Sequence, residues 1–415
     1  MYRVRGGSYR YGRGFGSRGE AAMPYYRVVG EVPRKRHVQF RRPDGGLYAE
    51  ELMGEEGFSS DSSLLYHRYA PTAIVKSEGV EEAPDGSDLV PNHPLQPRAY
   101  RTQDLPAGGD LVRGRQVLFG NEDVRLSFVA GDGVGDLYRN STGAEVVYVQ
   151  EGAARFESAF GVLEVGSGDY VVVPTGTVHR WVPRGPVRAL VIEGRGHIRP
   201  PRRYLSQYGQ FLEHAPYSER DLRGPGEPLL VEGDHVPVLV RNRGGLSRLT
   251  YRHHPFDVVG WDGYLYPYAF NIGDFEPIVK RTHAPPPVHQ TFEGPNFVIC
   301  SFCPRPLDFH DEAVPIPYNH HNVDSDEMMF YVGGDYSARR GSGIGIGSVS
   351  LHPSGFTHGP QPGAVEAVVE AVRQGHDRTT ETAVMIDTFR PLRLGPAARR
   401  CEDPEYAWTW ARAAG

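Results

Sequence analysis

The chain has 415 residues, 39% of them apolar, which is enough to build one large core or two cores of ordinary size. Its net charge of −6 argues against a general nucleic-acid binder, and the sequence has no run of about 18 apolar residues that would predict a membrane span. Three cysteines cannot form a disulfide framework, so we expect a cytoplasmic protein.

Glycine and proline are abundant, with 51 and 35 residues, and they accompany 23 tyrosines and 18 phenylalanines. This composition is typical of many short strands joined by tight turns and unlike that of a helix bundle. Residues 1–22 are rich in Arg and Gly and show no apolar periodicity. We therefore expect them to form a disordered extension.

The rest of the chain alternates between loops and extended runs. Residues 76–110 are rich in Pro, Asp and Glu and predict a crossing loop, whereas residues 115–131 and 144–194 alternate like paired strands. The best helix-like segment is "RRYLSQYGQFLEH" at 202–214. A second dense strand region is expected from about 295 to 390.

The two strand regions share one pattern. In the first, Glu145 is followed seven residues later by a glycine and then by the hexapeptide "PTGTVH", which ends at His179. In the second, Glu327 is followed by a glycine at the same spacing and then by "PSGFTH", which ends at His358. Two such arrangements in one chain indicate an internal duplication.

This layout resembles the cupin barrel, whose motifs are His-x-His-x(3,4)-Glu-x6-Gly and Pro-x-Gly-x-x-His. The resemblance implies an all-β dominated fold with two cupin-like barrels of the double-stranded β-helix (jelly-roll) type, together with a few short helices and long loops. We expect an N-terminal domain at residues 23–240 with a degenerate barrel, and a catalytic C-terminal barrel at residues 241–415.

Fitting the first motif to "PYNHHNVDSDE" places its two histidine positions at His320 and Asn322. His321 lies between them and is expected to point the other way, although it stays open as the alternative ligand. The predicted metal ligands are then His320, Glu327 and His358. Two imidazoles and one carboxylate leave coordination positions open, as in non-haem Fe(II) oxygenases, whereas structural zinc sites more often close with four ligands.

The first repeat has a weaker ligand set. It keeps Glu145 and His179, but Tyr138 and Asn140 stand at the two histidine positions. Because two ligands hold a metal poorly, we expect this barrel to be structural and to contain no iron.

The motifs in the second half resemble a narrower family. The segments "HPFDVVGWDGYLYPYAFNIGDFEPI", "HAPPPVHQTFE", "PYNHHNVDSDE" and "GSVSLHPSGFTHGP" follow one another and are similar to the homogentisate 1,2-dioxygenase family, especially its bacterial branch. The resemblance implies an extradiol-type ring cleavage of homogentisate by O₂ with Fe(II), giving maleylacetoacetate in tyrosine and phenylalanine catabolism. It also implies a homo-oligomer, either a trimer or trimers paired into hexamers.

The resemblance also assigns roles to single residues. The proton acceptor near the substrate's para-hydroxyl falls on His283, and a substrate-contacting tyrosine falls on Tyr336. His358 is expected to border the substrate as well as to bind the metal. His352 and Asn322 are expected to support the metal ligands. Better-studied members have one residue fewer between the asparagine and the glutamate, which is a departure from the family pattern.

Two other functions fit the same residues. The first is a ring-cleaving dioxygenase for another para-diphenol, such as gentisate. The second is a non-catalytic bicupin that binds a metal or a small ligand. A histidine near an open-sided ligand set favours an enzyme over the second alternative.

Overall fold

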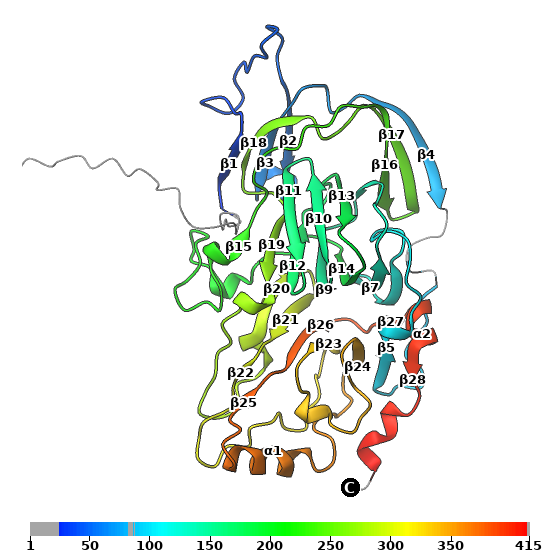
Figure 1. Cartoon of the computed structure of the whole chain (residues 1–415), viewed down its shortest axis with the longest axis vertical. Helices are drawn as coiled ribbons and strands as arrows, with labels where there is room; N and C mark the ends of the chain where they lie inside the picture. Colours follow the sequence, from blue (N-terminus) through cyan, green and yellow to red (C-terminus); the bar gives the residue numbers. More distant parts are fainter. Residues whose placement is uncertain (1–24, 82–85, 87, 413–415) are drawn as a thin grey trace, which may run out of the picture.

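The computed structural model describes residues 25–81, 86 and 88–412, so the expected disordered extension at 1–22 lies outside the described residues. Strands dominate the described chain, and Figure 1 shows them stacked along the long axis of the molecule with α1 (Ala364–Arg373) at the lower end. This confirms the prediction of a β-dominated, cupin-like fold. The sheets of the described residues remain open at their edges and do not close into barrels.

Three sheets lie outside the second repeat, and the second and third of them contain the strands of the first repeat. The first has the order β1 (Arg27–Gly30), β18 (Val258–Gly263), β3 (Ser62–His67) and β2 (Ala49–Gly54). The second has the order β11 (Gly161–Gly166), β10 (Ala153–Ser158), β13 (His179–Pro183), β8 (Leu137–Asn140), β16 (Asp234–Asn242), β17 (Gly245–His253) and β4 (Ile74–Glu81). The third has the order β15 (Leu222–Arg223), β19 (Tyr268–Asn271), β12 (Asp169–Val173), β9 (Glu145–Glu151), β14 (Val187–Gly194), β7 (Val124–Gly131), β6 (Gln116–Gly120) and β27 (Arg393–Leu394).

The second repeat forms what we call the site sheet. Its order is β20 (Gln290–Gly294), β21 (Phe297–Phe302), β26 (Thr382–Thr388), β23 (Asp326–Gly333), β24 (Ser348–His352), β5 (Arg98–Arg101) and β28 (Glu402–Asp403). A small two-stranded sheet, β22 (Arg305–Pro306) with β25 (Arg378–Thr379), lies beside it, and the short helix α2 (Pro396–Cys401) precedes β28.

Strands from each half of the sequence enter sheets of the other half. Strand β5 pairs with β24 in the site sheet, whereas β18 and β19 pair with β3 and β12. The prediction that residues 76–110 form only a crossing loop was therefore wrong, because β5 lies inside that range. The expected domain boundary at residue 240 stays a prediction.

The predicted helix at 202–214 was also wrong. The segment forms one short turn of 3₁₀ helix at Arg202–Tyr204 and then a tight turn. The Ser206 hydroxyl accepts hydrogen bonds from the backbone N–H groups of Tyr208 and Gln210. Gly209 has a φ of +86°. A serine side chain that competes for backbone donors and a left-handed glycine both interrupt a helix. Helix α1 lies inside the region that was expected to be dense in strands.

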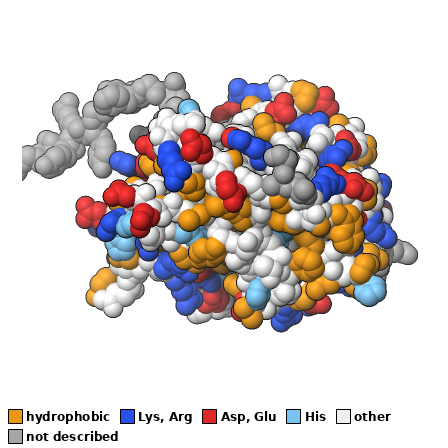
Figure 2. Space-filling view, turned by 90° about the horizontal axis from the view of Figure 1, so that it is seen from below, with side chains coloured by type: hydrophobic (Ala, Val, Ile, Leu, Met, Phe, Trp, Pro, Cys, Tyr) orange, Lys and Arg blue, Asp and Glu red, His pale blue; other side chains and the backbone are white. Residues whose placement is uncertain are grey.

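Strand β23 positions the site because its residues alternate between two buried faces. Glu327, Met329 and Tyr331 point to one face and line a cavity, whereas Met328 and Phe330 pack into the main hydrophobic core on the other. Apolar side chains also gather on the surface at the lower end of the molecule (Figure 2). None of the helices in the described segments is long and apolar enough to cross a membrane.

Candidate metal centre and substrate cavity

His320 and His358 are held together by their own backbones. The N–H of each donates to the carbonyl of the other at 2.8 Å, which forms an isolated antiparallel bridge. Their side chains therefore lie on the same face, with ring centroids 4.4 Å apart. Glu327 lies beside them on β23, and the candidate ligand atoms of the three residues all lie within 4.8 Å of one another. His321 is exposed and its Nδ1 lies 3.4 Å from the Thr357 hydroxyl, away from this cluster.

The first repeat shows the same geometry, which supports this alignment of the motif. There, Tyr138 pairs with His179 across β8 and β13, as His320 pairs with His358. The N–H of Gly176 donates to the carbonyl of Asn140 at 2.8 Å, and the N–H of Gly355 donates to that of Asn322 at 2.7 Å. The two halves thus share backbone contacts as well as sequence motifs.

Hydrogen bonds fix the orientation of both imidazoles. Nδ1 of His320 donates to the carbonyl of Tyr318 at 3.0 Å, and Nδ1 of His358 donates to that of Phe356 at 3.1 Å. This leaves the Nε2 lone pair of each ring facing Glu327, at 3.9 Å and 3.5 Å from its carboxylate oxygens. A backbone carbonyl that binds one ring nitrogen while the other stays free is the usual arrangement of a metal-binding histidine.

Glu327 is buried and remains ionised. Burial by itself would raise its pKa, but contacts from His320, His352 and His358 hold the pKa well below its usual range. His352 donates from Nδ1 to Oε1 of Glu327 at 2.9 Å and accepts from the Tyr406 hydroxyl at 3.0 Å. His352 therefore fixes the orientation of the Glu327 carboxylate. In metal sites, side chains that do not bind the metal commonly orient the ligands by such hydrogen bonds.

The donor set fits a divalent metal. Nε2 of His358 is enclosed and has no hydrogen-bond partner among the described residues, although a buried nitrogen of this kind normally has one. An anionic carboxylate and two imidazole lone pairs converge on the same point, and such a set with open positions suits Fe(II). These residues could therefore hold the iron that the sequence predicts.

A cavity of about 380 Å³ opens beside the cluster. Its wall includes His320, Asn322 and Glu327, and also His283 and Tyr336. His352 and His358 are not among the residues that line it, so the expected contact of His358 with a substrate stays a prediction. The cavity is large enough for a single aromatic ring with a short side chain.

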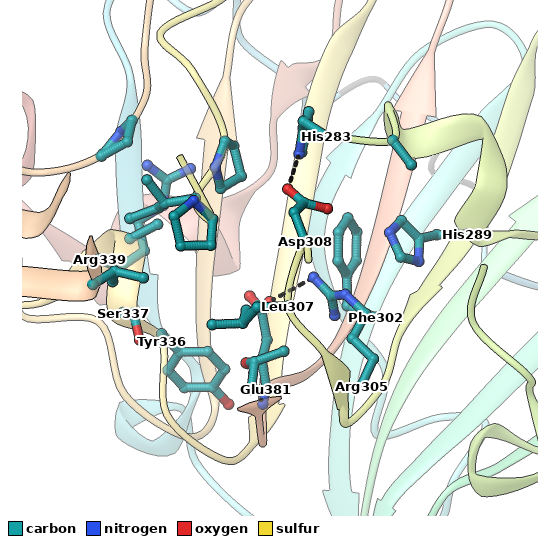
Figure 3. Close-up of a pocket in the computed structure, with 18 of the residues that line it drawn as sticks. His283, His289, Phe302, Arg305, Leu307, Asp308, Tyr336, Ser337, Arg339 and Glu381 are labelled. Atoms are coloured by element: carbon teal, nitrogen blue, oxygen red, sulfur yellow. Dashed lines mark hydrogen bonds and ion pairs between the residues drawn. The ribbon is translucent and has the colours of Figure 1, made fainter. Parts of the chain in front are cut away.

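His283 lies on the cavity wall in the loop before the 3₁₀ helix Pro286–His289. Figure 3 shows it pointing toward Asp308, and its Nδ1 lies 3.8 Å from Oδ2 of that residue. Burial lowers the pKa of His283 below its usual value, Asp308 raises it, and His320 and Arg305 lower it further. The imidazole is therefore neutral near pH 7 and able to accept a proton.

Tyr336 is buried on another part of the wall, near Arg339 (Figure 3). Its hydroxyl lies 3.5 Å from the carbonyl of Thr382, which is a weak contact. The Arg339 guanidinium is already engaged, because it donates to the Tyr331 hydroxyl at 3.1 Å and to the carbonyl of Gly359 at 2.7 Å. The Tyr336 hydroxyl is therefore less strongly hydrogen-bonded than the Arg339 guanidinium.

Several cavity residues were not singled out from the sequence. Arg305 faces Glu381 at 3.6 Å, and the pair belongs to the polar part of the wall (Figure 3). His289 also lines the cavity and stacks on Phe302 with ring centroids 4.5 Å apart. Asp308 and Glu381 lie in loops, Arg305 lies on a two-residue strand and His289 ends a 3₁₀ helix, so no periodic pattern in the sequence identifies them.

The fold and this site together define a duplicated cupin protein in which the second repeat carries a candidate 2-His-1-carboxylate centre. Two family models match the chain: "Homogentisate 1,2-dioxygenase N-terminal" over residues 10–272 and "Homogentisate 1,2-dioxygenase C-terminal" over residues 277–414. The chain belongs to the homogentisate 1,2-dioxygenase family, which confirms the resemblance seen in its motifs.

Three sequence relatives agree with this assignment. The chain is 38% identical to a Saccharolobus solfataricus protein named "putative dioxygenase", over 94% of this chain and 99% of the relative. It is 27% identical to homogentisate 1,2-dioxygenase of Emericella nidulans, over 88% and 85%, and 26% identical to that of Bradyrhizobium diazoefficiens, over 96% and 93%. A solved cupin 2 conserved barrel domain protein from Leptotrichia buccalis aligns with a TM-score of 0.34 and 10% identity, over 73% of this chain and 100% of that one.

Proposed function

We propose that this protein is an Fe(II)-dependent ring-cleaving dioxygenase that converts homogentisate and O₂ to maleylacetoacetate. The observation that carries the proposal is the convergence of His320, Glu327 and His358 at one end of a cavity sized for an aromatic substrate. Family membership supports a ring-cleaving dioxygenase, and the names of two relatives support homogentisate as the substrate.

Each residue has a defined task in this proposal. Fe(II) bound at the three ligands would supply the redox chemistry and open coordination positions that bring both reactants together. His283 accepts the proton of the substrate's para-hydroxyl, which raises the electron density of the ring. Tyr336 offers its hydroxyl to the substrate, and His352 keeps the Glu327 carboxylate in place through its 2.9 Å hydrogen bond.

The proposal is tested by iron analysis together with oxygen consumption on a panel of substrates. Homogentisate, gentisate and unsubstituted hydroquinone should be compared at saturating O₂, with product identification by mass spectrometry. Homogentisate should give the highest kcat/KM and a ring-opened product. A higher kcat/KM with gentisate would identify gentisate as the preferred substrate instead of homogentisate. Bound metal without oxygen uptake on any phenol would favour a non-catalytic bicupin.

Assembly and location belong to the same proposal. We propose that the chain acts in the cytoplasm as a trimer or as trimers paired into a hexamer. Exposed apolar side chains near the cavity support a surface that another copy covers, including Phe309, Tyr318 and Val323. Light scattering of the purified protein gives the number of chains, and a monomer at micromolar concentration would contradict this part.

A further inference from the structure

Asp308 lies on the cavity wall directly opposite His283. Both residues line the cavity, and Oδ2 of Asp308 is 3.8 Å from Nδ1 of His283 (Figure 3). The Asp308 side chain is largely enclosed, with 14% of its surface exposed, against 25% for His283. No pattern in the sequence pairs the two residues, which are 25 positions apart on different loops.

The backbone holds these two loops side by side. The N–H of His310 donates to the carbonyl of Arg281 at 2.8 Å. His310 lies two residues after Asp308, and Arg281 lies two residues before His283. On the other side of Asp308, the N–H of Leu307 donates to the carbonyl of Asp377 at 2.7 Å. Asp308 is therefore anchored on both sides and cannot swing freely away from His283.

Among the charged groups around His283, Asp308 is the one that stabilises the protonated imidazolium. Burial raises the pKa of Asp308, whereas His283 and Arg305 lower it. Asp308 favours the charged form of His283, while His320 and Arg305 disfavour it. The Tyr318 ring and the imidazole pack in a T-shaped contact with 5.0 Å between centroids, which limits rotation of the histidine.

We propose that Asp308 is the positioning residue of His283: it accepts a hydrogen bond from Nδ1–H and leaves Nε2 as the nitrogen that receives the substrate's proton. The inference rests on the proposed function, in which His283 is the base. The separation of 3.8 Å exceeds a hydrogen bond, so the pair must close by roughly 1 Å when substrate binds. Catalytic hydrogen bonds are often long without substrate and shorten in the complex.

The proton balance explains why a carboxylate is useful there. The O–H bond of the para-hydroxyl breaks, an N–H bond forms at Nε2, and the substrate becomes a phenolate while His283 becomes an imidazolium. A carboxylate beside Nδ1 stabilises the imidazolium and selects the tautomer in which Nε2 carries the lone pair. Without Asp308, His283 would be a weaker base, and its proton could lie on either Nδ1 or Nε2.

The test compares Asp308→Asn, Asp308→Glu and the control Asp311→Asn. Asp311 is an exposed acid three residues further along the same loop, so its substitution changes the same charge outside the cavity. The first measurement is kcat and KM of the iron-loaded enzyme with homogentisate. The second needs no turnover: the pH dependence of His283 modification by diethylpyrocarbonate, read by peptide mass spectrometry, reports the pKa of this imidazole.

In Asp308→Asn, kcat should fall at least about tenfold with KM changed less than about threefold, and the modification midpoint should move to lower pH by about 1. Asp308→Glu should recover part of the loss, and Asp311→Asn should match the wild type in both measurements. An unmoved midpoint in both Asp308 variants would overturn the inference, as would a moved midpoint with unchanged kcat. If the wild type consumes no O₂ with homogentisate, the proposed function fails, while the modification experiment still decides whether Asp308 acts on His283.

Discussion

Arg115 donates two hydrogen bonds to Glu145, one to each carboxylate oxygen and each at 2.9 Å. In the first repeat, Glu145 is the counterpart of Glu327. The side chains of Arg115 and Glu145 are both almost fully enclosed. The Tyr138 hydroxyl and the Asn140 amide also donate to Oε1 of Glu145, at 2.8 and 2.9 Å. In the first repeat, a guanidinium thus neutralises the carboxylate that corresponds to the predicted metal ligand Glu327.

From this pairing we predict that iron binds only in the second repeat, at about one ion per chain. His320→Ala and Glu327→Ala should lose most of the iron, whereas His179→Ala should retain it. Metal analysis of the purified variants checks this. Iron retained in His320→Ala and lost in His321→Ala would show that the motif is aligned one residue off.

Arg115 itself should be important for stability. Burial would raise the pKa of Glu145, but Arg115 lowers it, so Arg115→Met would leave a buried carboxylate without its cation. Loss of one partner of a buried ion pair costs about 3–5 kcal/mol in the free energy of unfolding. Denaturant unfolding measures the loss, and Arg188→Met serves as a control because the half-buried Arg188 makes only a loose contact with the exposed Glu151. Equal stability of the two variants would contradict the prediction.

For His283 we predict a loss of kcat by roughly 10²–10⁴-fold in His283→Gln, with iron content unchanged. Glutamine still forms a hydrogen bond to the substrate but cannot accept its proton. Removing the para-hydroxyl from the substrate should cost the wild type a similar factor, and the two changes together should cost little more than either alone. Fully additive losses in this two-by-two comparison would exclude a direct action of His283 on that hydroxyl.

The pH dependence of the reaction follows from the environment of His283. Its pKa lies below the usual value of about 6.5, mainly because the ring is partly buried. The neutral, active form therefore persists to lower pH than for an exposed histidine, and kcat/KM should decline only as the pH falls below about 6.5. A pH profile in which kcat/KM is already halved above pH 7 would be inconsistent with this.

A buried histidine in the first sheet should make stability depend on pH in the alkaline range. Nδ1 of His67 lies 2.6 Å from Asp257 and Nε2 lies 3.0 Å from Glu51. Burial would lower its pKa, but the two carboxylates raise it to about 9. Because the folded value exceeds the unfolded value of about 6.5, the stabilisation is complete below pH 6.5 and is lost as the pH rises through 9.

We therefore predict that wild type exceeds His67→Gln in free energy of unfolding by an amount that shrinks by about 3 kcal/mol between pH 6.5 and 9.5. Denaturant unfolding at a series of pH values measures this difference. His37→Gln is a suitable control, because this histidine is exposed although it contacts Glu50 at 2.6 Å. A difference that stays constant with pH would show that His67 is not charged in the folded state.

The sequence predicted the duplication and the ligand cluster because these depend on short motifs with fixed spacing. A turn such as Pro353–His358 and the glutamate on β23 have the same local requirements in each repeat, so they recur in the sequence. By contrast, Asp308 reaches the cavity from a loop and Arg305 from a two-residue strand, and the position of both depends on long-range contacts. Strand β5 was missed for the same reason, since only its distant partners β24 and β28 make it a strand.

The pairing of β5 with β24 also affects how the protein can form during synthesis. Residue Arg101 pairs with Ser348, so the ribosome adds roughly 250 residues after β5 before its partner exists. At about 5–20 residues per second, β5 waits on the order of 10–50 s without a neighbour in its sheet. The predicted metal ligands on β23 and at His358 are made in the same late interval, so the predicted iron site is complete only after it, and the nascent chain carries β5 without a sheet partner until then.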